Sequence, residues 1–460
     1  MADLIIRNGF VVTMDRDRRV LSDGAVAIEG RNIVAVGPTD EVLAQHKATH
    51  VIDATDRMIL PGLIDGHNHP FQFLSKGIGD DVDIMTWLYR RVYPYEAAVN
   101  GEEAYVGALA NYTQMLKSGT TCFNDPGGHH ADELAQAAVD FGIRGIVNRS
   151  TRDAADQEVP VPAKLFESTE EAVRQSERHV TKWNGAADGR IRAWTSLRYI
   201  FNCTDELCTE IKALADRLDV GIHCHVAAVH GENEGIQERF GKRSLARYYD
   251  LGLFGPNLYL VHMGYPDDQE IRWLKSENVK IAHCPSASMF GAYGVIQNKK
   301  MPEMIEAGLT VSLGTDSATA GRFLDMVRVM YLASSAHKDA YHDPLKIGAY
   351  KALEMATIEG ARACLWDDEI GSLETGKRAD VIVVDMSGLH WHPNPDPICT
   401  LVYAANGNDV ETVVVDGKIL MKDRVLTTVD EDRLTRDVKA AGVAWRERAD
   451  MQSGARWPIL

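Results

Sequence analysis

The chain has 460 residues, of which 45% are hydrophobic and 25% are charged, an ordinary composition for a globular protein with a sizeable core. Its formal net charge of −17 argues against nucleic acid or an anionic membrane as a partner, because both attract basic surfaces. No apolar run approaches the roughly 18 residues that span a bilayer, and the first residues lack a signal peptide's basic and apolar regions. We therefore expect a cytoplasmic protein that acts on small molecules.

The seven cysteines are odd in number and include no Cys-x-x-Cys pair. Disulfide frameworks need paired cysteines, and thiolate zinc sites usually contain closely spaced ones. Neither feature is therefore predicted.

Short strands are predicted at both ends of the chain. In the first 58 residues they are separated by turn signals such as Asn8-Gly9. These strands are Leu4–Ile6, Phe10–Thr13, Ala25–Glu29, Asn32–Val36 and His50–Asp53. A unit of this size does not stand comfortably alone, and the last part of the chain offers more strands. They are Val381–Asp385, Thr412–Val415 and Lys418–Met421.

Between about residues 59 and 365, predicted strands alternate with stretches that have apolar residues at helical spacing. The predicted helices are 102–116, 132–141, 168–183, 205–218 and 301–307. This alternation is typical of a parallel barrel wrapped in helices, an α/β fold. A polar helix is also predicted near the end of the chain.

The segment from Pro70 to Asn100 interrupts this regular pattern, and we expect it to be a long loop. It is rich in aromatic residues, namely Phe71, Phe73, Trp87, Tyr89, Tyr93 and Tyr95. These side chains either form a wall over an active site or pack the loop onto the barrel, and the sequence leaves both interpretations open.

Histidines and an aspartate stand at the ends of four predicted strands. These residues are His67, His69, His223, His225, His262 and Asp316. In each His-x-His pair the two side chains point to the same face of a strand, so both imidazoles can bind one ion. One such pair alone is commonly just a polar strand end, but the recurrence at four strand ends favours a metal site. Barrel enzymes place their chemistry at these carboxyl ends.

The ordered motifs resemble those of the amidohydrolase superfamily over nearly the whole chain. They are PGLIDGHNHP at 61–70, SGTT at 118–121, HCH at 223–225, VHMG at 261–264, HCP at 283–285, GTDS at 314–317, MATIEGAR at 355–362 and GSLETGKRADVIVVD at 371–385. Within the superfamily the chain looks most like the branch that holds triazine hydrolases and deaminases of adenosine-type nucleosides.

This resemblance implies a (β/α)8 TIM-like barrel over residues 59–365. It also implies a small β-sandwich composed of residues 1–58 and 366–430, followed by a C-terminal helical tail over 431–460. Because members of the family assemble into dimers to hexamers, a homo-oligomer is expected.

The resemblance further implies that the chain binds a divalent metal ion, most readily zinc, with cobalt, manganese or iron as alternatives. The implied ligands are His67, His69, His225 and Asp316. The family motif makes the second histidine of HCH the ligand, so His223 is expected to be a core or supporting residue. Members with two ions bridge them through a lysine on the fourth strand. The predicted fourth strand, 191–198, has no lysine, so we predict one ion per subunit.

Two of the motif residues are expected to do the chemistry. A divalent ion lowers the pKa of its bound water from near 16 toward about 7. Asp316 is predicted to take the proton from this water and pass it to the leaving group. His262 is predicted to polarise the attacked group or to orient the water, the alternative being a satisfied core histidine.

Two departures from the branch pattern alter the expected substrate. Relatives carry a glutamate that protonates a ring nitrogen, three residues after the fifth-strand ligand, whereas this chain has Ala228. Glu232 or Glu234 remain as substitutes. Arg198 replaces a fourth-strand histidine, and its guanidinium can hold a carbonyl oxygen or an anion, or form a salt bridge in the wall.

We expect four residues to line the substrate site. Arg198 and Ala228 are the two departures just described. Trp87 is included because the family often has an aromatic residue at this place, and His283 because it belongs to the HCP motif.

These departures favour a substrate that needs no ring protonation. We predict hydrolysis of a neutral N-substituted urea, amide, carbamate or thiocarbamate by metal-hydroxide attack on the carbonyl. Phenylurea hydrolases and molinate hydrolases are the relatives that this pattern most resembles. The alternative is a deaminase or dechlorinase of a purine, pterin or s-triazine. A scaffold without activity is a third possibility, against which the histidine and aspartate set argues.

Overall fold

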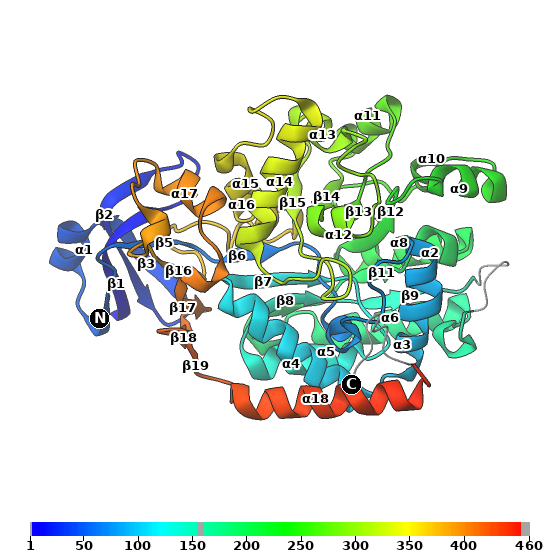
Figure 1. Ribbon diagram of the computed structural model, residues 1–460, viewed down its shortest axis with the longest axis horizontal. Coiled ribbons are helices and arrows are strands. Elements are labelled where there is room, and N and C mark those ends of the chain that lie inside the picture. The colour runs from blue at the N-terminus through cyan, green and yellow to red at the C-terminus, as the bar shows by residue number, and fades with distance from the viewer. Residues whose placement is uncertain (1, 155–160, 452–460) are drawn as a thin grey trace, which may run out of the picture.

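The computed structural model describes residues 2–154 and 161–451. In Figure 1, strands from both ends of the chain lie together on one side of a larger body in which helices surround parallel strands. The expected α/β class, a TIM-like barrel beside a sheet made from both termini, is therefore confirmed.

The terminal sheet joins segments that are more than 300 positions apart. Its strands in the described residues are β1 (Ala2–Val12), β2 (Val20–Glu29), β3 (Asn32–Pro38), β4 (Ala48–Asp53), β5 (Arg57–Pro61), β16 (Val381–Asp385), β17 (Val410–Val415), β18 (Lys418–Lys422) and β19 (Val425–Leu426). β5 pairs with β1 on one side and with β16 on the other, so it connects the two ends of the chain. Alternate apolar residues of these strands enclose a small separate core, as expected for strands with one buried face.

The barrel strands lie side by side and parallel. They are β6 (Leu63–Asp65), β7 (Thr120–Asp125), β8 (Arg144–Val147), β9 (Arg149–Thr151), β10 (Ile191–Arg192), β11 (Thr195–Leu197), β12 (Ile222–Val226), β13 (Leu258–His262), β14 (Lys280–His283) and β15 (Val311–Leu313). β8 continues into β9 and β10 into β11, so eight strand positions are present in the described part of the chain. Gly66 N donates to Leu313 O at 2.8 Å and Asp316 N to His67 O at 2.8 Å, which closes the barrel between β15 and β6.

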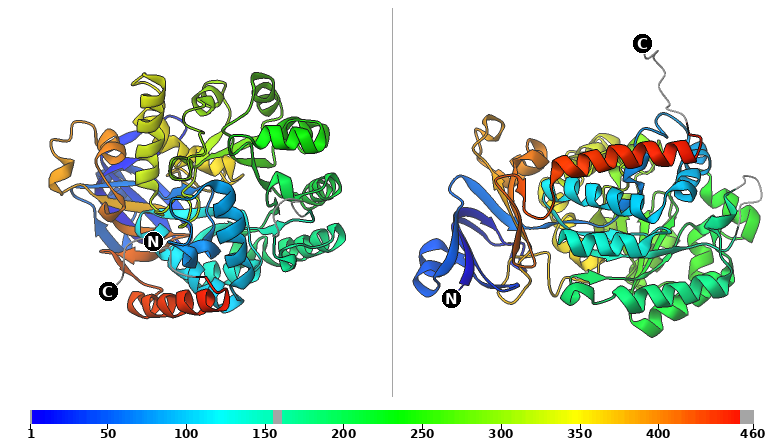
Figure 2. Two further views of the ribbon diagram at one scale, coloured as in Figure 1. Left: turned by 45° about the vertical axis from the view of Figure 1, so that its right-hand side comes forward. Right: turned by 90° about the horizontal axis from the view of Figure 1, so that it is seen from below.

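Helices cover the outside of these strands (Figure 2). The main ones are α4 (Gly101–Lys117), α5 (Ala131–Phe141), α6 (Thr169–Trp183), α8 (Asp205–Leu218), α9 (Glu232–Phe240), α10 (Ser244–Asp250), α11 (Asp268–Ser276), α13 (Lys300–Glu306), α14 (Met326–Tyr341), α15 (Ala349–Met355) and α16 (Ile358–Ala363). The five predicted helices are confirmed to within a few residues. Side-chain caps explain several starts, for example Ser168 on α6 and Thr204 on α8.

The segment 70–100 is not the loop that we expected. It folds into short helical turns, namely η1 (Pro70–Ser75), α2 (Ile84–Trp87), η2 (Leu88–Val92) and α3 (Tyr93–Ala98). The side chain of Asp83 accepts from two backbone N–H groups at the start of α2. Turns of four to six residues are too short to show a clear apolar period, so the sequence pattern does not reveal them.

The predicted helical tail corresponds to α18 (Glu431–Arg448), which runs along α4 in Figures 1 and 2. Trp445 is buried, and its Nε1 donates to the carbonyl of Leu74 at 3.1 Å. The Trp445 ring also packs edge-on against Tyr95. The helix thus holds the 70–100 segment against the barrel. Residues 452–460 of the predicted tail lie outside the described residues, and the domain boundaries remain predictions.

Candidate metal and substrate site

The strand-end residues converge at the carboxyl end of the barrel. One set of ligand atoms, from His67, His69 and His225, lies within 4.8 Å of one another. A second set, from His67, His262 and Asp316, meets the same limit and shares His67 with the first. All of these side chains are buried, and they come from the ends of β6, β12, β13 and β15.

The Asp316 carboxylate lies at the centre of these contacts. Its Oδ1 is 3.8 Å from His67 Nε2 and 3.7 Å from His69 Nε2, and its Oδ2 is 3.9 Å from His262 Nε2. His69 Nε2 and His225 Nε2 are 3.3 Å apart. Two nitrogens at about 2.0–2.1 Å from a tetrahedral zinc ion lie about 3.4 Å from each other. The observed spacing therefore suits ligands that share one ion.

Hydrogen bonds set which ring nitrogen of each histidine has a free lone pair. Asn124 Oδ1 only accepts, so His223 Nδ1–H donates to it across 2.9 Å. His223 Nε2 must then accept from His67 Nδ1–H at 3.0 Å. The lone pair of His67 is left on Nε2, a buried atom with no hydrogen-bond partner. Both ring nitrogens of His223 are used in hydrogen bonds, so this residue is placed to orient His67.

A similar bond orients His225. Its Nδ1 donates to the backbone carbonyl of Arg198 at 2.8 Å, which leaves Nε2 with a lone pair facing the cluster. Burial lowers the pKa of His67, His69 and His225 well below the usual histidine value, so the rings are neutral near pH 7. Neutral imidazoles with free Nε2 atoms are the form that binds a divalent cation, so these residues fit the expected group.

Asp316 differs from an ordinary exposed aspartate. Burial raises its pKa to about 7, while the backbone N–H of Ser317 donates to Oδ1 at 2.7 Å and opposes this rise. A carboxyl group with this pKa can accept a proton and release it again near neutral pH.

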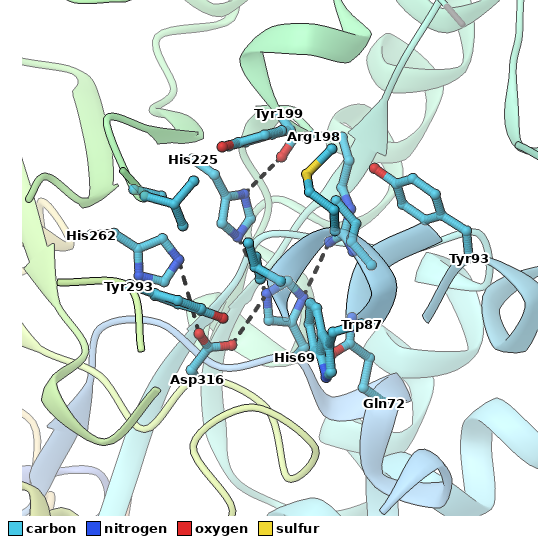
Figure 3. A pocket seen from close by; sticks show the side chains of 15 residues that line it. His69, Gln72, Trp87, Tyr93, Arg198, Tyr199, His225, His262, Tyr293 and Asp316 are labelled. Carbon is cyan, nitrogen blue, oxygen red and sulfur yellow. Dashed lines mark hydrogen bonds and ion pairs between the residues drawn. The ribbon is translucent and has the colours of Figure 1, made fainter. Parts of the chain in front are cut away.

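The cluster opens into a cavity (Figure 3). Asp316, His262 and Tyr293 lie on one side of His69 in this view, and Trp87, Tyr93 and Gln72 lie on the other. Apolar side chains complete the wall, namely Ile84, Met85, Leu88 and Val229. A mostly apolar cavity with a few polar groups is typical of a site for a small organic molecule.

Three of the four predicted substrate residues line this cavity, namely Trp87, Arg198 and Ala228. His283 is not among its lining residues. Its Nε2 is 3.1 Å from Nε2 of His337, and the side chain is fully buried. The two histidines pack against each other in the core, so the HCP motif places its histidine away from the open space.

Ala228 leaves a gap that neither nearby glutamate fills. The carboxylate of Glu232 accepts from Ala227 N at 2.5 Å, Ala228 N at 2.8 Å and Tyr199 Oη at 2.7 Å, and from Ser244 Oγ at 3.0 Å. This carboxylate is buried and bonded to four donors, and neither Glu232 nor Glu234 lines the cavity.

Sequence reasoning missed several residues of the wall and its support. They are Gln72, Glu96, Tyr199 and Tyr293. Glu96 has no motif of its own, but its position in an aromatic segment directly after two metal ligands was the available signal.

No helix in the described ranges is both long and apolar enough to cross a membrane.

The barrel and its convergent histidines define a metal-dependent hydrolase, and the comparisons identify its family. The sequence profile of the amidohydrolase family matches residues 58–420, and that of a bacterial imidazolonepropionase-like composite domain matches residues 24–46. The chain belongs to the amidohydrolase family, whose members named below act on C–N bonds.

Two relatives match along almost their full length. A 5-methylthioadenosine/S-adenosylhomocysteine deaminase of Caldanaerobacter subterraneus subsp. tengcongensis is 35% identical over 437 residues, which cover 95% of this chain and 97% of that protein. A 5'-deoxyadenosine deaminase of Methanosarcina acetivorans is 35% identical over 450 residues, covering 98% and 100%.

Solved structures give the same fold. An adenosine deaminase from Xanthomonas campestris with bound zinc superimposes with a TM-score of 0.91 at 29% identity, covering 98% of this chain and 99% of that one. The atrazine chlorohydrolase from Arthrobacter aurescens TC1, complexed with zinc, has a TM-score of 0.88 at 23% identity, covering 95% and 100%. Together with the histidine cluster, the family and the zinc-bound adenosine deaminase support a divalent metal ion in this chain.

The predicted urea or thiocarbamate hydrolysis is wrong, as is the special likeness to phenylurea and molinate hydrolases. Relatives at 35% identity over nearly the whole chain carry deaminase names, which favours the alternative stated above. The prediction gave one position, Ala228, more weight than the rest of the barrel. A missing carboxyl group at one wall position changes how a substrate is protonated, but it does not by itself exclude a ring substrate.

Proposed function

We propose that the protein is a metal-dependent deaminase that replaces the exocyclic amine of a heteroaromatic ring with oxygen. Water is the second reactant and ammonia is the second product. The observation that supports this proposal most strongly is the 35% identity over 95% of the chain to a 5-methylthioadenosine/S-adenosylhomocysteine deaminase. Adenosine-type nucleosides are therefore the first substrates to test.

In this proposal His67, His69, His225 and Asp316 hold one ion, and the zinc bound in the Xanthomonas campestris neighbour makes zinc the first choice. A divalent ion held by such a set lowers the pKa of water from 15.7 to about 7 and so supplies a nucleophile at neutral pH. The neutral rings and the free Nε2 atoms described above prepare the site for this role.

Asp316 is the proton carrier. Its carboxyl group lines the cavity beside the other proposed ligands, so it is placed to take a proton from the attacking water and give it to the departing amine. His262 also lines the cavity, with Nε2 3.9 Å from Asp316 Oδ2. Burial lowers its pKa to about 4, so the ring is neutral and is placed to orient the attacking water.

The wall suits a planar ring. Trp87, Tyr93 and Tyr293 offer flat aromatic surfaces, and the apolar residues of the 70–100 segment exclude water around them. At Ala228, the ring edge meets a methyl group in place of a carboxyl proton donor. We therefore expect slower turnover of simple adenosines than a glutamate at this position would allow.

The test is a turnover assay with zinc-reconstituted protein. Adenosine, 5'-deoxyadenosine, 5'-methylthioadenosine, S-adenosylhomocysteine and guanine are each incubated with the protein, and ammonia and product mass are measured. We expect ammonia from at least one of them, with the mass change of amine-to-oxygen exchange. Absence of ammonia from every aromatic amine, with the metal site filled, would contradict the proposal.

A further inference from the structure

One end of the cavity contains donors that lack acceptors. Arg198 is only 4% exposed, and its Nη2 donates to Glu96 Oε1 at 2.5 Å. The Nη1 atom of Arg198 lies 3.4 Å from His69 Nδ1. When His69 uses Nε2 as a ligand, Nδ1 carries the proton, so two donors face each other. Nη1 then has no acceptor among the described residues.

Two buried guanidinium groups lie beside this end of the cavity. Glu96 also accepts from Arg152 Nη2 at 2.8 Å, so one carboxylate serves two guanidinium groups, both nearly fully buried. Burial lowers the pKa of His129 to about 3, so its ring is neutral and adds no charge next to the two guanidinium groups. Burial also raises the pKa of Asp125 to about 8, so this group is mostly protonated at neutral pH. Glu96 is thus the one carboxylate in the described ranges that hydrogen-bonds to both guanidinium groups, and Asp316, the carboxylate that lines the cavity, is a ligand of the proposed ion.

Gln72 adds a second unused donor. It lines the same cavity, is fully buried, and neither Nε2 nor Oε1 of its amide has a hydrogen-bond partner. Buried amides are nearly always paired in folded proteins, because burial without a partner costs free energy. Figure 3 shows Gln72 beside His69 and Trp87, on the side of the cavity away from His262.

We propose that the substrate carries an anionic oxygen group, a carboxylate, which Arg198 Nη1 and Gln72 Nε2 bind. A carboxylate offers two acceptor oxygens, one for Arg198 Nη1 and one for Gln72 Nε2, and it brings a negative charge to the two guanidinium groups that share Glu96. Two buried guanidinium groups share one carboxylate, so a ligand that brings a second negative charge gains binding free energy. The identity of the reacting ring rests on the proposed function. The anion site does not, because binding alone tests it.

The test compares benzoate with benzamide as ligands of the zinc-loaded protein by titration calorimetry. The two molecules have nearly the same shape and differ in charge. We expect benzoate to bind at least tenfold more tightly. Arg198→Met should reduce this preference to less than twofold, and Arg198→Lys should keep part of it. Gln72→Leu should weaken benzoate binding severalfold without abolishing the preference.

Folding of the variants is favoured, because Arg198→Met leaves Glu96 and Arg152 as a balanced pair. Arg243→Met is the matched control, since Arg243 pairs with Glu270 outside the cavity and should leave both affinities unchanged. Equal affinity of the wild type for both ligands would overturn the inference. A preference that survives Arg198→Met would also overturn it, because the carboxylate would then bind the metal.

Ammonia release is measured separately on aminopurines that carry an acetate group or its amide at N9. A selective benzoate site without any ammonia release would refute the proposed function and leave the anion site standing. Ammonia release with no preference for benzoate over benzamide would support the proposed function and refute the anion site.

Discussion

His67 and His223 share a buried hydrogen bond of 3.0 Å between Nδ1 and Nε2, and this bond fixes the proton of His67 on Nδ1. The positions of these ring protons follow from Asn124, whose Oδ1 can only accept a hydrogen bond, so that His223 carries its proton on Nδ1. His223 therefore fixes the free lone pair of His67 on Nε2, which lies 3.8 Å from Asp316 Oδ1, although His223 is not one of the clustered residues that could hold an ion.

Removal of this control should weaken metal binding. Because partners of this kind typically change metal affinity by about 10–100-fold, we expect His223→Leu to lower zinc affinity within this range. His223→Gln should retain part of the affinity, since its Oε1 can accept from His67 Nδ1–H. Competition with a chromogenic chelator measures the effect. His390→Gln, at an exposed histidine, is the control and should bind zinc like the wild type.

Asp316→Asn should abolish turnover and leave the fold intact. The substitution keeps the shape of the side chain but removes a ligand charge and the group that moves the proton. We expect the rate of ammonia release to fall by at least about 10²–10⁴-fold, the usual contribution of a positioned acid–base group. Unchanged circular dichroism confirms folding, and a variant with a normal rate would remove Asp316 from the mechanism.

Removal of the metal should affect stability as well as activity. An ion that binds only the folded chain stabilises it by about 2.7 kcal/mol at a hundredfold excess over Kd. Dialysis against a chelator should therefore end ammonia release and lower Tm, and added zinc should restore both. A chelated protein with full activity and unchanged Tm would speak against a resident ion.

The sequence is informative about the fold because the strand ends and helical periods are local patterns. His67, His225, His262 and Asp316 each follow an apolar run, so their convergence follows from the barrel alone. Pairings that depend on folding are not visible in this way. Glu96 and Arg198 are 102 positions apart, and Glu96 lies in turns too short to carry a period.

Ala228 shows a different limit of sequence reasoning. A residue that departs from a motif indicates a change in the wall, but it does not say which substrate the rest of the wall accepts. The unused donors of Gln72 and Arg198 became apparent only with the geometry of the cavity.

Arg144 links the barrel to the terminal sheet and should be important for stability. It is fully buried on β8, with Nε 2.6 Å from Asp380 Oδ2 and Nη2 3.0 Å from Asp416 Oδ1. Arg144→Met leaves the buried carboxylate of Asp380 without its cation, whereas Asp416 keeps Arg31 at 2.7 Å. Breaking a buried pair in this way costs about 3–5 kcal/mol, so the midpoint of urea unfolding should fall. Arg174→Met, at an exposed pair on α6, should not change it measurably.

Ala228→Glu should increase deamination of neutral adenosine-type nucleosides. Ala228 lines the cavity next to the HCH strand, and a carboxyl group there offers a proton to the ring edge of the substrate. A positioned general acid contributes about 10²–10⁴-fold, and we expect a gain of about tenfold or more in kcat/KM since part of this is lost to imperfect placement. Ala228→Gln is the matched control, because an amide of the same shape cannot deliver a proton. Equal rates for the glutamate and glutamine variants would show that the ring proton comes from elsewhere in the site.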